Sequence, residues 1–373
     1  MLSCGEPSGD LYAGALVRAL RARESRLEAF GLGGPGLAAS GARLVADFRG
    51  LSVTGLTEAL KILPRSLATY RQLVEAASRD RPDVLVLIDY PDFNFRLMKA
   101  AKALGIPIVY YISPQLWAWR PGRMKVMKAL VDRVLVIFPF EEALYRGEGM
   151  DVRFVGHPLL EMTAPSADRT TLLREFKLDG TRPIVALLPG SRPNELVRLA
   201  AVLGLAAGQI AVRVPPAQFI VARAPHLDDG LFEPLAAPAG RIVEGRTDDV
   251  LSLSDVVLTA SGTATVQTAM HGKPMVVLYK LSPLTYTLGK PLARVDMYAM
   301  VNLIAGRRVV LELIQDACTP EAVADEAVSL LTDRAKRETM VRELEEVKAA
   351  LGGLGASGRA ADAIVDLVHA RAR

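Results

Sequence analysis

The sequence has little of the material from which metal sites, disulfide frameworks and membrane spans are built. Only two cysteines occur, Cys4 and Cys318, and neither lies in a Cys-x-x-Cys pair, which argues against a disulfide framework and a zinc site. The four histidines lack metal-ligand spacing, and no Asp-x-Asp pair is present to hold Mg²⁺ or Mn²⁺. We therefore expect chemistry without a metal or cofactor, in a reducing cytoplasm.

Long apolar runs and a large charge excess are also missing. No stretch approaches the ~18 apolar residues of a spanning helix, and the N-terminus has no basic region followed by an apolar one. The 45 Lys and Arg residues face 41 Asp and Glu residues, so the net charge is +4. This excess is far below that of a dedicated nucleic-acid binder, so no nucleic acid is expected as a partner. A mild positive bias suits an anionic ligand or an anionic membrane surface.

What the sequence does contain is an alternation of apolar strands and helices. At 373 residues, half of them apolar, the chain is long enough for two packed domains. A second strand-helix series begins at residue 184, after a polar stretch at 161–182 that we expect to be a linker. The predicted fold is α/β with two doubly wound sheets facing each other. The predicted strands lie at residues 1–4, 83–88, 106–112, 133–138, from 184 onward, 219–221, 241–243, 256–259 and 275–279.

Residues 184–195, IVALLPGSRPNE, form the stretch around which the second half is organised. An apolar strand runs into a Pro-Gly-Ser-Arg turn and then a helix, so backbone N–H groups and a helix N-terminus face one point where a phosphate fits. Arg192 adds a planar, permanently charged fork that matches phosphate oxygens. On this motif alone, a diphosphate site and an ordinary turn with a surface arginine are equally good interpretations.

A second stretch, residues 254–270, repeats this design and favours the diphosphate site. Its apolar strand ends at Ser261, Gly262 and Thr263, where another helix with free N–H groups is predicted to begin. Two such turns in one half of the chain indicate one ligand held between two helix N-termini.

The first half carries the candidate acid-base groups. The strand at 83–88 is a continuous apolar run typical of a parallel sheet, and it delivers Asp89 to its carboxyl end, where ligands sit in open α/β sheets. Asp92 either adds a second carboxylate or caps the next helix. Residues 1–4 form a very short strand before the glycine-containing turn at 5–10, so we expect the natural start codon to lie upstream.

Three further stretches allow more than one interpretation. Residues 30–35 contain a GxGG pattern, which predicts a glycine turn more readily than a dinucleotide site. Residues 113–120 hold both tryptophans, which either pack in the core or contact a phosphate on an acyl-bearing ligand. Residues 51–74 predict an amphipathic helix whose apolar face either packs in the core or touches lipid. That face comprises Leu56, Ala59, Leu60, Leu63, Leu67 and Tyr70, with Lys61, Arg65 and Arg71 elsewhere on the helix.

Seven motifs, in order along nearly the whole chain, resemble those of the lipid-A-disaccharide synthases. WAWR and SGTAT combined with PGSR are specific to that family as a set, although PGS-type turns alone recur in many nucleotide-sugar enzymes. The motifs are GEPSGD at 5–10, LIDYPDFN at 87–94, ISPQLWAWR at 112–120, FVGHPL at 154–159, LLPGSR at 187–192, SGTAT at 261–265 and NLIAG at 302–306.

The resemblance implies a GT-B glycosyltransferase with two facing Rossmann-like domains and C-terminal helices that cross back to the first. It implies an acceptor- and membrane-facing domain at residues 1–165 with about 345–373, and a UDP-sugar-binding domain at residues 166–344. The implied reaction condenses UDP-2,3-diacylglucosamine with 2,3-diacylglucosamine 1-phosphate (lipid X) into the β-1,6-linked lipid A disaccharide 1-phosphate and UDP. The enzyme would associate peripherally with the cytoplasmic face of the inner membrane, and the resemblance fixes no oligomeric state.

The family's functional positions carry over to Asp89, Arg192 and Asn302. Asp89 is the predicted general base, because an inverting transfer is one displacement and needs a single carboxylate. The predicted UDP-sugar site comprises Gly190, Ser191, Arg192, Ser261, Gly262, Thr263, Ala264, Gln267 and Asn302. The acceptor-side candidates are Glu6, Ser8, Gly9, Asp10, Trp119 and Arg120.

One position departs from the family pattern. The helix after SGTA usually carries a glutamate where this chain has Gln267. We expect Gln267 to remain a ribose ligand and Gln267→Glu to bind UDP at least as well, unless the ribose is held elsewhere. Two other functions stand beside the synthase: another GT-B-like enzyme such as a UDP-N-acetylglucosamine 2-epimerase, and a UDP-sugar- or phospholipid-binding protein without catalysis.

Overall fold

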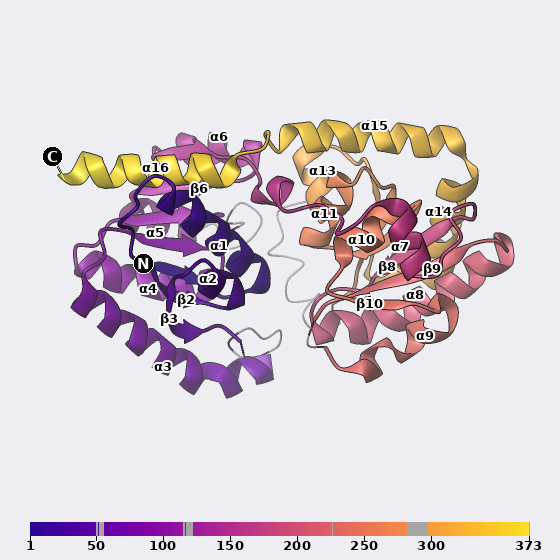
Figure 1. The fold of residues 1–373 in the computed structure, drawn as a ribbon, viewed down its shortest axis with the longest axis horizontal. Coiled ribbons are helices and arrows are strands. Elements are labelled where there is room, and N and C mark those ends of the chain that lie inside the picture. The colour runs from indigo at the N-terminus through magenta and orange to yellow at the C-terminus, as the bar shows by residue number, and fades with distance from the viewer. Residues whose placement is uncertain are drawn as a thin grey trace. The chain divides into compact units, whose positions relative to one another are not determined.

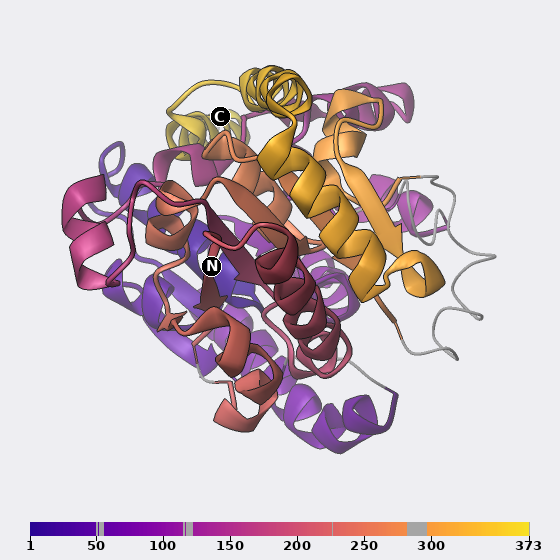
Figure 2. The same ribbon diagram turned by 90° about the vertical axis from the view of Figure 1, so that its right-hand side faces the viewer.

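The computed structural model describes residues 1–49, 51, 56–114, 116, 122–225, 227–281 and 297–372. They form two compact units, Met1–Glu161 with Leu351–Arg373 and Met162–Ala350. Each unit is a parallel sheet with helices packed around it (Figures 1 and 2). The candidate residues Trp119 and Arg120 lie outside the described residues.

The first unit is built on a seven-stranded sheet with the strand order β3-β2-β1-β4-β5-β6-β7. Every residue of its central strands is buried, as expected for apolar runs in a parallel sheet covered on both faces. The strands are β1 (Leu2–Cys4), β2 (Phe30–Gly33), β3 (Arg43–Asp47), β4 (Leu85–Ile88), β5 (Ile108–Tyr111), β6 (Arg133–Val136) and β7 (Val152–Phe154). The helices are α1 (Pro7–Arg21), α2 (Pro35–Ala39), α3 (Leu56–Asp80), α4 (Pro91–Ala103), α5 (Arg123–Leu130), α6 (Pro139–Gly147), the 3-10 turn η1 (Pro158–Glu161) and α16 (Ala356–Ala372).

The second unit is built on a six-stranded sheet with the order β10-β9-β8-β11-β12-β13. Its central strands, β8 (Ile184–Leu188) and β11 (Val256–Ala260), are buried at every position. The other strands are β9 (Gln218–Arg223), β10 (Ile242–Glu244), β12 (Met275–Tyr279) and β13 (Leu311–Ile314). The helices are α7 (Arg169–Glu175), α8 (Pro193–Arg213), η2 (Asp229–Phe232), α9 (Glu233–Ala239), α10 (Thr247–Leu253), α11 (Thr263–Met270), α13 (Met300–Ala305), η4 (Gln315–Ala317), α14 (Pro320–Thr332) and α15 (Arg334–Ala350).

The predicted class, two parallel α/β sheets, is confirmed, and α16 packs against α1 so that the C-terminus returns to the first unit (Figure 1). Besides β2, which is described below, three strands were not predicted: β3, β7 and β13. Each is an edge strand, and most of its residues are half-buried or exposed, so it lacks the continuous apolar run that marks a central strand.

The glycine turn expected at residues 30–35 is wrong for its first four residues, which form the buried strand β2. The glycine pattern instead permits close strand contact. Gly31 has φ +153°, and a Cβ there would lie 1.8 Å from the carbonyl oxygen of Leu2 in the paired strand β1. Glycine is therefore required at position 31, because β2 lies inside the sheet and a side chain there would collide with the backbone of β1.

The boundary between the two units, after Glu161, falls at the start of the linker expected at residues 161–182, but the rest of that stretch is not a linker. Most of this stretch belongs to the second unit, where α7 is capped by Asp168, whose carboxylate accepts from the Thr171 N–H. Leu172 and Phe176 are buried in the core of that unit. The polar composition reflects an exposed helix face, whereas two apolar side chains suffice to anchor it.

Helix α8 corrects the expectation about long apolar segments. By length and composition alone, its 21 residues are long and apolar enough to cross a membrane, and less than half of its most apolar part is buried. A single such helix is weak evidence for a span, because core helices pass the same test. Here one face, including Leu199, Leu203 and Ile210, packs in the core.

Helix α3 begins at Leu56 and extends to Asp80, beyond the end predicted from sequence. Its core-facing residues include Leu73, Ala76 and Ala77, which are nearly inaccessible. By contrast, Leu63 and Leu67 of the predicted apolar face are 48% and 42% exposed. Core packing therefore does not account for these two leucines.

His157, from the GHPL motif, lies buried inside the first unit. Its ring contacts Tyr12 edge-on at 6.1 Å and Phe138 at 5.5 Å between centroids. Nδ1 accepts a hydrogen bond from the Leu159 N–H at 3.2 Å. Burial lowers the pKa of His157 to about 3, so the imidazole is neutral at physiological pH.

We predict that lowering the pH from 7 to 5 destabilises the protein through His157. The pKa rises from about 3 in the folded chain to 6.5 in the unfolded chain, so only the unfolded chain binds a proton in this window. Stability is complete above the unfolded pKa and is lost as the pH falls toward the folded pKa. The expected loss in unfolding free energy is roughly 1–2 kcal/mol.

Denaturant titrations at both pH values measure this loss. In His157→Asn the amide oxygen still accepts from the Leu159 N–H but does not titrate, so the difference between the two pH values should shrink. His369→Asn, at a side chain that is 59% exposed, is the matched control. An unchanged pH dependence in His157→Asn would contradict the assignment.

Candidate functional site

The Pro-Gly-Ser-Arg turn joins β8 to α8 at the carboxyl edge of the second sheet. Gly190 has φ +117°, and Arg192 is the N-cap of α8. Glu195, in the first turn, accepts from the Ser191 N–H at 3.0 Å and the Arg192 N–H at 3.4 Å. A Cβ on Gly190 would lie 2.3 Å from a Glu195 carboxylate oxygen, so this turn requires glycine.

Glu195 changes how the turn is interpreted as an anion site. Its carboxylate occupies two of the backbone N–H groups that the sequence assigned to a phosphate, and it lies 3.4 Å from Nη1 of Arg192. The Arg192 side chain is 43% exposed. A diphosphate at this turn would therefore meet the guanidinium first, and would compete with Glu195 for the N–H groups.

The Ser261-Gly262-Thr263 turn lies at the same edge, because β11 pairs directly with β8 and Thr259 is opposite Leu188. Gly262 has φ +147° and precedes α11 as its N-cap. Gly262 and Thr263 are exposed, and a Cβ on Gly262 would meet nothing within 4 Å. The structure thus brings the two predicted turns onto adjacent strands, with open space at the second.

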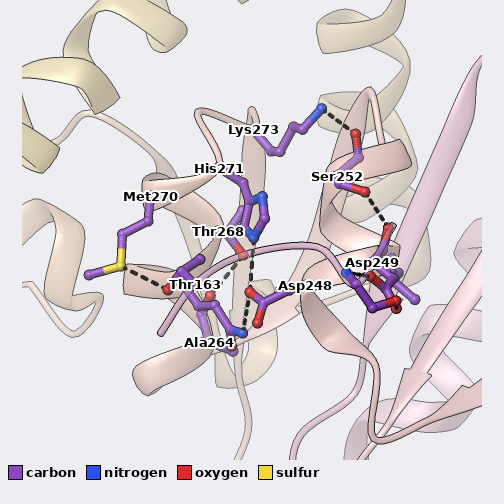
Figure 3. Close-up of polar contacts among 12 residues, drawn as sticks. Thr163, Asp248, Asp249, Ser252, Ala264, Thr268, Met270, His271 and Lys273 are labelled. Carbon is purple, nitrogen blue, oxygen red and sulfur yellow. Dashed lines mark hydrogen bonds and ion pairs between the residues drawn. The ribbon is translucent and has the colours of Figure 1, made fainter. Parts of the chain in front are cut away.

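Gln267 lies half-buried on α11 and has a partner that the sequence did not suggest. Its Nε2 donates to Oδ1 of Asp248 at 2.8 Å. The same oxygen lies 2.9 Å from Nε2 of His271 (Figure 3), so one carboxylate contacts both side chains. Asp248 is in the first turn of α10.

Asn302 is fully buried, and its side chain is satisfied within the protein. Oδ1 accepts from the N–H groups of Val309 and Val310 at 2.8 and 3.0 Å. Nδ2 donates to the Val310 carbonyl at 3.0 Å and to Glu312 at 2.7 Å. Glu312 in turn accepts from the N–H groups of Tyr298 and Ala299, at the start of α13. This geometry occupies the Asn302 side chain with protein partners, and its expected contact with the donor stays a prediction.

Asp89 directly follows β4, at the carboxyl edge of the first sheet, and is half-exposed. Its φ is +46° and that of Tyr90 is +50°, an uncommon left-handed pair. Three groups fix this backbone. The Asp89 carbonyl accepts from the Tyr110 hydroxyl at 2.8 Å and from Asn94 at 2.7 Å, and its N–H donates to Ile112 at 3.2 Å.

Tyr90 packs its ring against Gly5, where a Cβ would lie 2.2 Å from a ring carbon. The Tyr90 hydroxyl donates to the Leu51 carbonyl at 3.1 Å. Burial, with smaller contributions from Glu6 and Asp92, raises the pKa of Tyr90 to about 12. The phenol is therefore neutral, and the turn at residues 5–10 lies beside the Asp89-Tyr90 pair.

The acceptor-side candidates divide into two groups. Glu6 is the N-cap residue of α1, with Ser8 and Gly9 in the first turn. Asp10 is 4% exposed, and its carboxylate accepts from the N–H groups of Gly34, Gly36 and Leu37 at 2.6–3.0 Å. Asp10 therefore anchors the glycine-rich turn before α2, and its expected role on the acceptor side stays a prediction.

Asp92 has an exposed side chain in the first turn of α4 and forms an ion pair with Arg123. The N-cap of that helix is Tyr90, so Asp92 does not cap it. Among the described residues, no group of three or more His, Cys, Asp and Glu side chains is placed to hold a metal ion.

Sequence reasoning missed four residues of this arrangement: Asn94, Glu195, Asp248 and Glu312. The Glu three residues after the N-cap was a signal for Glu195, since that spacing is typical of a capping box. No comparable signal existed for Asp248, whose partners lie 19 and 23 residues along the chain.

Comparison with known proteins gives consistent results over the full length. Residues 1–361 match the family model described as lipid-A-disaccharide synthetase. The chain is 44% identical over 372 residues to a lipid-A-disaccharide synthase of Myxococcus xanthus, covering 99% of this chain and 97% of that protein. It is 41% identical over 374 residues to one of Geobacter sulfurreducens, with the same coverage of each.

The chain is also similar to solved structures, but at sequence identities below 20% this similarity shows the fold alone. A UDP-GlcNAc 2-epimerase from Neisseria meningitidis, bound to UDP-GlcNAc, superposes with a TM-score of 0.68 at 12% identity and covers 98% of each chain. A calicheamicin glycosyltransferase superposes with a TM-score of 0.59 at 19% identity, covering 99% of this chain and 97% of that one. Both likenesses support a GT-B-like fold.

We predict that Asn302→Ala destabilises the protein more than it weakens ligand binding. The change leaves two buried N–H groups and Glu312 without their partner, which costs roughly 2–4 kcal/mol and lowers the melting temperature by about 5–15 °C. Gln218→Ala is the matched control, because Gln218 bridges the backbone N–H and carbonyl of Asp179 at an exposed site. An unchanged melting temperature with a raised donor KM would show that Asn302 contacts the donor.

Proposed function

The chain belongs to the lipid-A-disaccharide synthase family, and on that basis we propose how its residues carry out the reaction. It is a glycosyltransferase of lipid A biosynthesis. We propose that the donor is UDP-2,3-diacylglucosamine, that the acceptor is 2,3-diacylglucosamine 1-phosphate, and that transfer is one inverting displacement. This membership replaces the epimerase and non-catalytic alternatives.

The second unit would bind the UDP-sugar. The support is the pair of turns at the carboxyl ends of β8 and β11, which are adjacent strands. Arg192 and the N-termini of α8 and α11 supply positive charge where the diphosphate departs, so this proposal needs no metal for leaving-group stabilisation. Gly190, Ser191, Gly262, Thr263 and Ala264 would line this site with backbone groups.

The first unit would bind the acceptor, and Asp89 would be its general base. The observation that carries this role is the fixed left-handed backbone at Asp89, held by Tyr110, Asn94 and Ile112. A strained conformation that several groups hold in place is typical of functional sites. Asp89 would remove the proton from the acceptor's 6-hydroxyl as that oxygen attacks the anomeric carbon and UDP leaves. Glu6, Ser8 and Gly9, which follow the adjacent strand β1, remain candidates for acceptor contacts.

We predict that Asp89→Asn lowers kcat roughly 10²- to 10⁴-fold, the usual effect of removing a positioned base. UDP affinity should stay within about twofold, because the change leaves the donor-binding unit intact. Asp92→Asn is the matched control: that carboxylate is three positions further and 76% exposed, and its loss should change kcat less than about threefold. Unchanged turnover in Asp89→Asn would overturn the assignment, and Glu6 would be tested next.

We also propose peripheral association with the cytoplasmic face of the inner membrane, where both diacylated substrates would be met. The exposed Leu63 and Leu67 lie four residues apart on α3, and Arg65 and Arg71 of the same helix are exposed. Apolar side chains with basic neighbours suit an anionic lipid surface. Most of the basic stretch at 280–308, a second candidate contact, lies outside the described residues.

We predict that the double variant Leu63→Ser/Leu67→Ser lowers partitioning onto anionic vesicles at least tenfold, because burial of a leucine in lipid contributes roughly 1.5–3 kcal/mol. Binding by the native protein should also weaken as salt rises. Leu354→Ser, at a leucine that is 72% exposed in the same unit, is the matched control and should bind like the native protein. Equal co-sedimentation of the double variant and the native protein would exclude this face.

A further inference from the structure

In the second unit, the carboxylate of Asp248 holds the side chain of Gln267, the residue that departs from the family pattern. Oδ1 of Asp248 accepts from Nε2 of Gln267 at 2.8 Å. The same oxygen lies 2.9 Å from Nε2 of His271 (Figure 3). The side chains of Asp248 and His271 are 24% and 9% exposed, so both contacts are shielded from bulk water. Asp248 comes from α10, whereas Gln267 and His271 come from α11 and its C-cap.

This contact determines which end of the Gln267 amide faces a ligand. An ionised carboxylate only accepts hydrogen bonds, so Gln267 must turn its NH₂ group toward Asp248. The carbonyl oxygen of the same amide then points in another direction. Within the described ranges, no residue donates a hydrogen bond to that oxygen. Gln267 therefore presents an acceptor.

We propose that Asp248 is a positioning residue of the donor site, which holds Gln267 with its carbonyl oxygen toward a ribose hydroxyl of UDP and excludes glutamate from position 267. The inference rests on the proposed function, and on the ribose contact that the sequence predicts for Gln267. The departure from glutamate at position 267 is then explained by the acid at position 248, because Gln267 can donate a hydrogen bond to Asp248 and a glutamate could not.

Glutamate is excluded because it would place a second carboxylate at hydrogen-bond distance from the first. Two like charges at that separation repel, and shielding from water strengthens the repulsion. The expectation from sequence that Gln267→Glu binds UDP at least as well is therefore reversed. In a relative with glutamate at this position, the residue equivalent to Asp248 should not be an acid.

The cations on these elements have other partners and would not relieve the repulsion. Arg246, the N-cap of α10, binds Asp249 at 2.6 Å and also Glu175. Lys273 donates to the Ser252 carbonyl at 3.1 Å (Figure 3). Asp249, next in sequence to Asp248, is 2% exposed and accepts from the N–H and hydroxyl of Ser166. Among the residues that the structure describes, His271 alone shares the Asp248 carboxylate with Gln267.

The test is a double-mutant cycle on the full chain, with melting temperature and the affinities of UDP and 2′-deoxy-UDP as readouts. The variants are Gln267→Glu, Asp248→Asn and their combination. We expect Gln267→Glu to lower the melting temperature by about 3 °C and to weaken UDP binding about tenfold. Adding Asp248→Asn to that variant should restore most of both losses, because the second charge is gone.

The control is Gln209→Glu. Gln209 donates to Glu321 at 3.3 Å in an exposed pair of the same chemistry. Because solvent screens that pair, we expect a melting temperature within about 1 °C of the native value. Asp248→Ala is the second arm. It should weaken UDP binding about fivefold and reduce the preference for UDP over 2′-deoxy-UDP, which a merely structural role would not change.

The outcomes test the pairing of Asp248 with Gln267 separately from the contact between Gln267 and the ribose. A loss in Gln267→Glu that Asp248→Asn does not restore overturns this pairing, whatever holds the ribose. If Gln267→Ala binds UDP and 2′-deoxy-UDP as the native protein does, the ribose contact predicted for Gln267 is wrong, and so is the positioning role of Asp248, whereas the proposed transfer reaction is untouched. Rescue in the combined variant, together with a lowered UDP preference in Asp248→Ala, supports the inference.

Discussion

Parallel strand pairing is the constraint on which the rest of this structure depends. All the strand pairs in both sheets are parallel, so each connection crosses a sheet face and the carboxyl ends of the strands meet at one edge. In the first unit this places the turn after β1 beside Asp89, which follows β4. In the second it places the turns after β8 and β11 side by side. The chemistry is therefore located by the topology before any side chain is considered.

Polar side chains then give these turns their shape. Asp10, Glu195 and Glu312 each accept hydrogen bonds from backbone N–H groups at or near a helix start, and Asn94 and Asn302 hold backbone carbonyls. Such contacts fix the backbone of these turns before a ligand binds. Binding then costs less conformational entropy, because the turns are already ordered. Glu195 has a second effect, because a diphosphate must compete with it.

The sequence was sufficient to predict a structural feature where one local pattern determines that feature. The continuous apolar runs at β4, β8 and β11 predicted buried parallel strands, and the strand-end rule predicted the place of Asp89. The roles of Asp10 and Asn302 were not predictable, because whether a polar side chain faces ligand or backbone depends on partners that only the fold brings close. On α3 the spacing of apolar residues did not show which side of the helix faces the core. Leu67 and Leu73 lie on different apolar sides of the helix, and the structure exposes Leu67 and buries Leu73.

The central claim is that one carboxylate at the edge of the first sheet drives a single inverting displacement. The most direct test is to incubate the enzyme with UDP-2,3-diacylglucosamine and 2,3-diacylglucosamine 1-phosphate, and to determine the product's linkage and anomeric configuration by mass spectrometry and NMR. The account predicts a β-1,6 bond, with UDP released only when the acceptor is present. An α-linked disaccharide, or release of UDP at the same rate without acceptor, would contradict it.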